Sequence, residues 1–286
     1  MRHVAIIGSD TVVGHALATQ LEKSCRITSQ TLRPGSLPGA GASGIGPHDS
    51  GYFEAGADCV VFCGEASRSS WDPEFGDLST DEHHIPSCAS AAAESGIPLI
   101  FISSDAVFRG PWMFHDESCD AFDGTRVAVR LLELERCVLS AGSNLVVRTN
   151  AIGSTGHGDT FLDSIVDAAL TLQPCELNST TWSTPISAAL LAAMFPKLLK
   201  HRLTGLLHLS GAERVSPWSF AGHLAAEMGS HRSLFPPATD AIHRTERSLH
   251  CARARQDLSL RMPAMKQTLD ALVDCMQIGL PELIAA

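Results

Sequence analysis

The first half of the chain alternates short apolar runs with segments of helical periodicity. The runs that we expect to be strands lie at residues 4–7, 27–32, 59–63, 98–103 and 144–148, and the helices between them at 13–21, 88–95 and 126–139. Runs such as 59–63 are apolar on both faces, as in a strand that helices cover on each side. The alternation predicts an α/β fold with a doubly wound parallel sheet of the Rossmann type.

The alternation stops near Gly153, which suggests a domain boundary. We expect residues 1–153 to form the Rossmann-type domain and residues 154–286 a smaller α+β substrate-binding region. The second part is expected to return one strand, near 206–210, to the sheet. Residues 34–50 contain three prolines and five glycines and are therefore expected to be a loop.

Composition excludes several classes of protein. The 286 residues carry a formal charge of −10 and are 44% hydrophobic, which argues against disorder and against a polybasic nucleic-acid surface. No apolar stretch is long enough to cross a membrane, and Asp10 interrupts any secretory signal, so we expect a cytoplasmic protein. The nine cysteines include no C-x-x-C pair, so free thiols are expected and no metal site.

The turn between the first strand and the first helix has glycine at its first and last positions, Gly8 and Gly14. A strand–turn–helix of this kind directs backbone N–H groups at a pyrophosphate, so we expect a bound dinucleotide, with a plain turn as the alternative. Thr11 replaces the middle glycine, and its β-carbon is expected to crowd the phosphates. A literal G-x-G-x-x-G at residues 39–44 follows no strand and opens no helix, and is set aside.

The end of the second strand indicates which dinucleotide is bound. No acidic residue stands there to bind a ribose 2′-hydroxyl, whereas Arg33 offers a guanidinium that suits a 2′-phosphate. We therefore expect NADP, with NAD still possible in principle. A solvated loop charge is the alternative interpretation of Arg33.

Several blocks resemble the extended short-chain dehydrogenase/reductases of the dTDP-4-dehydrorhamnose reductase type. The segment I-S-S-D-A-V-F-R-G at 102–110 is similar to the family's I-S-T-D-Y-V-F-D-G, and V-R-T-N at 147–150 is similar to V-R-T-S. The segment G-L-L-H-L-S-G at 205–211 is similar to G-x-Y-H-L-S-G. Such blocks follow the family's order from residue 4 to about residue 272.

The resemblance implies reduction of a nucleotide-linked keto sugar. In the family a Tyr-x-x-x-Lys pair, assisted by a Ser or Thr hydroxyl, delivers the proton while the nicotinamide delivers the hydride. Ser104 matches the assisting hydroxyl, but the single tyrosine, Tyr52, lies upstream of the third strand. Aligned on Glu135, the helix carries Val127 and Leu131 at the two positions of the pair.

Shifting this alignment by one residue places Arg126 and Arg130 at the two positions instead. An arginine stays protonated and is a poor general acid, although two arginines four residues apart can bind one anion. A surface pair with Glu133 is the alternative for Arg130. A substitute proton donor could come from His115 or Asp116, although His115 also fits an ordinary loop residue.

The turn and the resemblance together define the expected site. The expected catalytic residues are Ser104, His115 and Asp116. The expected cofactor-binding residues are Gly8, Asp10, Thr11, Val12, Val13, Gly14, Arg33, Cys63, Gly64, Glu65 and Ser103. The residues expected to bind substrate or phosphate are Arg126, Arg130 and Trp182, with core packing as the alternative for Trp182.

Two functions remain open at this point. The first is an NADP-binding reductase-like protein for a nucleotide-linked keto sugar that lacks the usual Tyr-x-x-x-Lys pair. The second is a non-catalytic NADP-binding regulatory or scaffold protein, similar to the methionine adenosyltransferase regulatory subunit, which acts through a protein partner. Across these two functions, the expected partners of the chain are a nucleotide-linked sugar, another protein or a second copy in a homodimer. Neither nucleic acid nor a membrane is expected as a partner.

Overall fold

The computed structural model describes residues 3–32, 53, 56–238 and 244–279. Six strands form one sheet in the order β2-β1-β3-β4-β5-β9, and every neighbouring pair is parallel. They are β1 (His3–Ile7), β2 (Arg26–Gln30), β3 (Cys59–Phe62), β4 (Leu99–Ser104), β5 (Leu145–Thr149) and β9 (Gly205–His208). The predicted α/β fold with a parallel, Rossmann-like sheet is confirmed.

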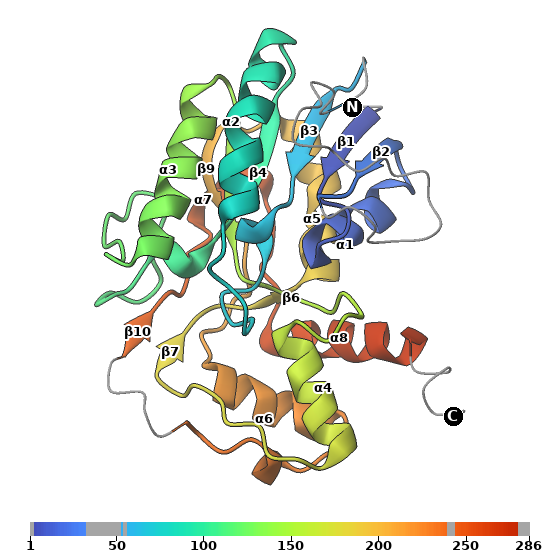
Figure 1. Cartoon of the computed structure of the whole chain (residues 1–286), viewed down its shortest axis with the longest axis vertical. Helices are drawn as coiled ribbons and strands as arrows, with labels where there is room; N and C mark the ends of the chain where they lie inside the picture. The colour runs from blue at the N-terminus through green and yellow to red at the C-terminus, as the bar shows by residue number, and fades with distance from the viewer. Residues whose placement is uncertain (1–2, 33–52, 54–55, 239–243, 280–286) are drawn as a thin grey trace.

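Helices cover both faces of the sheet, as Figure 1 shows. One face packs against α1 (Val12–Leu21) and α5 (Ala188–His201), and the other packs against α2 (Ser79–Glu94) and α3 (Arg126–Ser140). Alternate residues of β1 serve the two cores: Val4 and Ile6 face the first, whereas Ala5 and Ile7 face the second. This double burial explains why the strands read as continuous apolar runs.

Helix α2 begins at Ser79 rather than at residue 88, where the sequence analysis placed it. Its first half contains adjacent histidines and Pro86, a residue that usually ends a helix. The helix nevertheless continues through Pro86 because Ile85 and Cys88 pack fully into the core. Tertiary packing therefore overrides the local signal that shortened the prediction.

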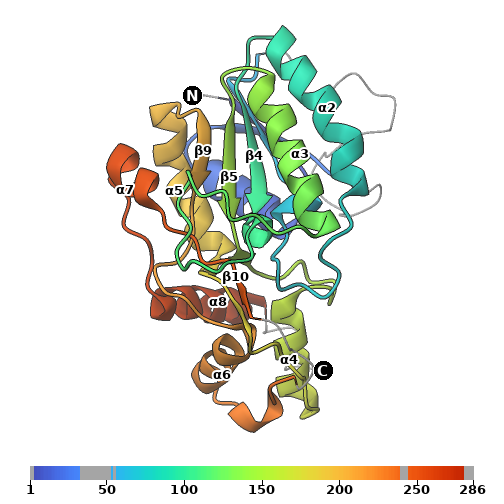
Figure 2. The same cartoon turned by 90° about the vertical axis from the view of Figure 1, so that its left-hand side faces the viewer.

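A second lobe lies beyond the carboxyl ends of the strands (Figures 1 and 2). It contains α4 (Phe161–Thr171), α6 (Pro217–Glu227) and α8 (Met265–Gly279), together with the parallel pairs β6 (Ala151–Ile152) with β8 (Ile186–Ser187) and β7 (Thr181–Trp182) with β10 (Thr245–Glu246). In the same half of the chain, β9 pairs with β5, and α7 (Ala252–Leu258) packs beside it. None of the described helices is long and apolar enough to cross a bilayer.

The loop that follows the short 3₁₀ helix η1 (Glu65–Ser67) joins the two lobes. The ring of Trp71 lies 5.2 Å from that of Phe161, centroid to centroid, in an edge-on contact. Asp72 Oδ1 accepts a 2.8 Å hydrogen bond from the backbone N–H of Phe161, and Arg68 Nη2 donates one to the carbonyl of Asp159. We call residues 68–72 the lobe clamp.

A buried ion pair joins α3 to β5. Arg148 donates from Nε to Glu135 Oε1 at 2.9 Å and from Nη2 to Oε2 at 2.6 Å, and both side chains are 3% exposed. Ser103 at the end of β4 donates to the same carboxylate at 2.6 Å. Three elements therefore depend on one bidentate contact.

A buried carboxylate fixes the turn after β3. Asp81, at the start of α2, accepts hydrogen bonds from the backbone N–H groups of Glu65 and Ala66 at 2.9 and 2.7 Å. Complete burial raises the pKa of Asp81 to about 7, because desolvation outweighs these two bonds. The folded protein therefore binds a proton at this group more readily than the unfolded chain.

The buried pair yields a stability prediction. Glu135→Gln leaves the Arg148 guanidinium buried without a counter-charge and should lower the free energy of unfolding by about 3–5 kcal/mol. The matched control is Asp257→Asn, which removes a pair with Arg253 whose side chains are about one-third exposed and should cost less than about 1 kcal/mol. Urea denaturation of the two variants measures the difference, and equal losses would contradict the prediction.

Asp81 yields a pH prediction. Its folded pKa lies above its unfolded pKa, so its penalty on folding is full above pH 7 and decreases as the pH falls below 7. The buried His208, whose pKa is lowered to about 3, acts in the opposite direction below pH 6.5. The free energy of unfolding should therefore rise more steeply from pH 8 to pH 6.5 in the parent than in Asp81→Asn. Parallel slopes in urea titrations would rule this out.

Candidate functional site

The turn after β1 packs directly against the end of β3. Gly8 has a φ of +82°, and an added β-carbon would lie 1.8 Å from the carbonyl oxygen of Cys63. At Gly14 an added β-carbon would lie 2.0 Å from the carbonyl oxygen of Gly8. Only glycine fits at either position, so both glycines are required by the close approach of backbone to backbone.

Thr11 lies inside this turn as the N-cap of α1. Its hydroxyl donates to the carbonyl of Gly8 at 2.8 Å and accepts from the N–H of Gly14 at 3.0 Å. Thr11 therefore caps α1, and the crowding of the phosphates by its β-carbon stays a prediction. The helix itself supplies no acceptor for the N–H groups of Val12 and Val13 in its first turn.

Asp10 connects the turn to the end of β2. Its Oδ1 accepts a 2.9 Å hydrogen bond from the backbone N–H of Leu32. The next residue, Arg33, lies outside the described residues, as do Tyr52 and the glycines at 39–44. The selectivity between NADP and NAD that Arg33 predicts therefore stays a prediction.

The three residues after β3 that were expected to bind the cofactor, Cys63, Gly64 and Glu65, are fixed by contacts within the protein. Burial raises the pKa of the Cys63 thiol, which is therefore neutral. Gly64 leaves the space that the Asp81 carboxylate occupies, because an added β-carbon would lie 1.7 Å from Asp81 Oδ1. Glu65 forms an ion pair with Arg68 at 3.7 Å. This segment thus forms a fixed wall beside the glycine turn.

A buried polar network lies where β4 ends, and sequence reasoning missed most of it. Ser104 accepts from the N–H of Ala106 at 3.1 Å, and the neighbouring Asp105 accepts a short hydrogen bond from Ser183. Ser183 in turn accepts from Asn150 Nδ2 at 2.9 Å. Burial is the main cause that raises the pKa of Asp105 above its usual range.

The network continues from Asn150 to the lobe clamp. Asn150 Oδ1 accepts a 2.6 Å hydrogen bond from Ser69 Oγ. Strand ends of both lobes and the loop after η1 thus share one buried set of polar groups. The signal in the sequence was an aspartate two residues after the apolar run 98–103, since such a residue must find partners at the edge of the sheet.

Helix α3 carries apolar side chains at the two positions that the alignment on Glu135 assigns to the family's pair. Leu131 is fully buried in the core, and Val127 packs close to the backbone of Gly76. Arg126, at the start of the helix, is exposed, and Arg130 Nε contacts Glu82 of α2 at 2.9 Å. The carboxylate that meets Arg130 is thus that of Glu82 rather than the anticipated Glu133.

His115 is a packed residue with both ring nitrogens engaged. It is 2% exposed and stacks on Phe108 with ring centroids 4.3 Å apart. Its Nε2 donates to the carbonyl of Glu246 at 3.0 Å, and its Nδ1 lies 3.1 Å from Cys119 Sγ. Burial is the main cause that lowers the pKa of His115, so the neutral ring is favoured. These contacts favour a structural role over proton donation.

Asp116 is stabilised as a carboxylate. It accepts hydrogen bonds from both the hydroxyl and the backbone N–H of Ser118, and these bonds lower its pKa. A carboxyl group with a lowered pKa holds no proton near neutral pH. Asp116 is therefore poorly suited to replace the missing phenol.

Trp182 already has a cation on its ring. The guanidinium carbon of Arg214 lies 3.8 Å from the ring centroid, and Arg214 Nε donates to Glu246 Oε2 at 2.8 Å. Arg244 approaches the same ring at 5.8 Å. The half-buried indole is therefore packed within the protein and flanked by two guanidinium groups. Any base or sugar that approaches the ring would meet these cations.

Comparison with known proteins places this geometry in a family. A family model described as the RmlD substrate binding domain matches residues 80–278. No curated protein matches the chain. Solved structures with the same fold include a dTDP-4-dehydrorhamnose reductase from Bacillus anthracis in complex with NADP, with a TM-score of 0.78, 18% identity and coverage of 96% of this chain and 99% of that chain.

Two further structures extend the comparison. A dTDP-4-dehydrorhamnose reductase from Yersinia enterocolitica has a TM-score of 0.75 and 17% identity, covering 96% of this chain and 99% of that one. A dTDP-glucose 4,6-dehydratase from Bacillus anthracis in complex with NAD has a TM-score of 0.81 and 11% identity, covering 98% of each chain. These likenesses concern the fold, whereas the family model spans more than half of the sequence. The chain therefore belongs to the RmlD substrate binding domain family.

Proposed function

We propose that the chain binds NADP at the turn after β1 and is a reductase-like protein for a nucleotide-linked keto sugar. Its structural relatives support this class, since they include complexes with NADP, with NAD and with UDP-glucuronic acid. In doubly wound sheets, ligands bind outside the carboxyl ends of the strands where the strand order reverses. Here that position lies between β1 and β3, where Gly8 meets Cys63.

The fit of the glycine turn to a pyrophosphate carries the proposal. Gly8 and Gly14 bring the backbone to the helix start without a β-carbon, and Thr11 directs its hydroxyl into the turn. The N–H groups of Val12 and Val13 would donate to the phosphate oxygens, and the positive end of the α1 dipole favours the same charge. NADP supplies a hydride when it is bound in its reduced form.

The chain's own residues offer a weaker proton relay than the family's pair. Val127 and Leu131 have no transferable proton, His115 is enclosed, and Ser104 is occupied as a cap. The group best placed to hold a proton is Asp105, but it is fully buried in its hydroxyl network. The apolar side chains of Val127 and Leu131 favour a second candidate function, a non-catalytic NADP-binding regulatory protein.

Cofactor binding gives the first test. We expect saturable binding of NADPH in fluorescence titrations, tighter than that of NADH by about tenfold because Arg33 would pair with the 2′-phosphate. Arg33→Ala should reduce this preference, and Arg261→Ala, an exposed arginine on the final loop, should leave it unchanged. Absence of NADPH binding at millimolar concentration would overturn the proposal, and equal affinities in the parent would remove the role of Arg33.

Turnover gives the second test. With a dTDP-linked 4-keto sugar, NADPH oxidation should have a kcat roughly 10²–10⁴-fold below that of the Bacillus anthracis reductase measured in parallel, because α3 carries no tyrosine to donate the proton. A comparable kcat would contradict this expectation, and its selective loss in Asp116→Ala or His115→Ala would identify the acid. NADPH binding with no oxidation by any keto sugar nucleotide would favour the regulatory function.

A further inference from the structure

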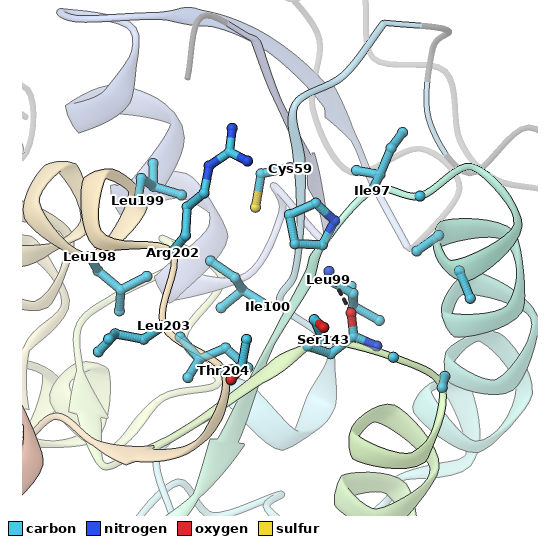
Figure 3. Close-up of a pocket in the computed structure, with 18 residues that line it drawn as sticks. Cys59, Ile97, Leu99, Ile100, Ser143, Leu198, Leu199, Arg202, Leu203 and Thr204 are labelled. Atoms are coloured by element: carbon cyan, nitrogen blue, oxygen red, sulfur yellow. Dashed lines mark hydrogen bonds between the residues drawn. The ribbon is translucent and has the colours of Figure 1, made fainter.

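A cavity of about 370 Å³ opens at the amino edge of the sheet, the edge opposite the glycine turn. It lies among the first residues of β3 and β4, the loop that leads into β4, and the ends of α2, α3 and α5. Figure 3 shows side chains from all of these elements around one space. Its volume falls in the range of pockets that enclose small organic ligands.

The lining of this edge cavity includes a cluster of apolar side chains. Leu99 and Ile100 come from β4, and Leu198 and Leu203 come from α5 and the loop that follows it. Burial raises the pKa of the Cys59 thiol to about 12, so this sulfur is an uncharged part of the wall. The wall therefore suits a hydrocarbon or aromatic body.

Ser143, Asn144 and Thr204 add polar side chains to the lining, and the Asn144 amide is already bonded within the protein. Asn144 accepts from the N–H of Leu99 at 2.9 Å and donates to the carbonyl of Val138 at 2.9 Å. Its amide thus joins the loop after α3 to the start of β4, and both of its ends are hydrogen-bonded without a ligand. A negatively charged group of a ligand would be paired by the arginine that lines the same cavity, Arg202.

The rim carries a cation. Arg202 follows α5 in a left-handed conformation, with a φ of +49°, and its guanidinium extends beside Cys59 at the opening in Figure 3. Among the described side chains, no carboxylate forms an ion pair with Arg202. Lys200 and His201 stand in the last turn of the same helix. The carboxyl ends of α2, α3 and α5 that meet here carry partial negative charges, which the Arg202 guanidinium opposes.

We propose that this edge cavity binds a small amphipathic anion. Its aliphatic or aromatic body occupies the apolar space, and its carboxylate pairs with the guanidinium of Arg202. The enclosure by side chains from several elements admits a small molecule rather than a protein segment. Because β4 runs from Leu99 to Ser104, roughly 17–20 Å separate this site from the carboxyl edge. Binding here therefore needs neither NADP nor a sugar nucleotide.

Calorimetric titration with three eight-carbon probes tests the charge and the body of the ligand separately. We expect octanoate to bind the full-length protein more tightly than octanol, and octylamine to bind most weakly. Arg202→Asn removes the charge and keeps a residue that adopts the left-handed conformation readily. This variant should weaken octanoate about three- to tenfold and leave octanol unchanged. The matched control Arg261→Asn should change neither affinity.

A second variant tests the cavity itself. Ala93 lines the space from an exposed position near the end of α2, so Ala93→Phe should fill it without disturbing the core and abolish binding of both octanoate and octanol. Unchanged circular dichroism and melting temperature verify that each variant is folded. Stronger binding of octylamine than of octanoate, absence of saturable octanoate binding to the parent, or full octanoate affinity in Ala93→Phe would each overturn the proposal.

Discussion

The contact between the backbone of Gly8 and the carbonyl of Cys63 is the constraint on which the site depends. It brings the ends of β1 and β3 together so closely that a β-carbon cannot be accommodated at Gly8. The same approach sets where α1 begins, and with it the direction of the first N–H groups of that helix. Cap, turn and strand ends therefore form one continuous surface at the reversal of strand order, where we propose that the pyrophosphate binds.

The parallel sheet could be predicted from the sequence because its strands are buried on both faces and therefore read as unbroken apolar runs. Helix α2 was predicted too short, since Pro86 and two histidines conceal a buried stripe that only tertiary packing reveals. The glycine turn was found by its context between strand and helix, although the function of Thr11 as a cap was not. A hydroxyl that bonds backward into its own turn cannot be told from one that points outward by spacing alone.

The polar residues at the carboxyl edge show a different limit of sequence reasoning. His115 was singled out for the pKa of its side chain, but it is enclosed by Phe108, Cys119 and the chain near Glu246. Asp105 received no attention, yet its contact with Ser183 joins the two lobes. The contacts of His115 with Glu246 and of Asp105 with Ser183 join segments more than seventy residues apart, and no local pattern contains them.

The lobe clamp has a consequence for the unfolding of this protein. Trp71, Asp72 and Arg68 belong in sequence to the first lobe but are bound to the start of α4 in the second. Unfolding of the second lobe alone would expose the indole of Trp71 and leave the buried Asp72 carboxylate without the N–H of Phe161. We therefore expect the two lobes to unfold together as one cooperative unit, despite the apparent boundary near Gly153.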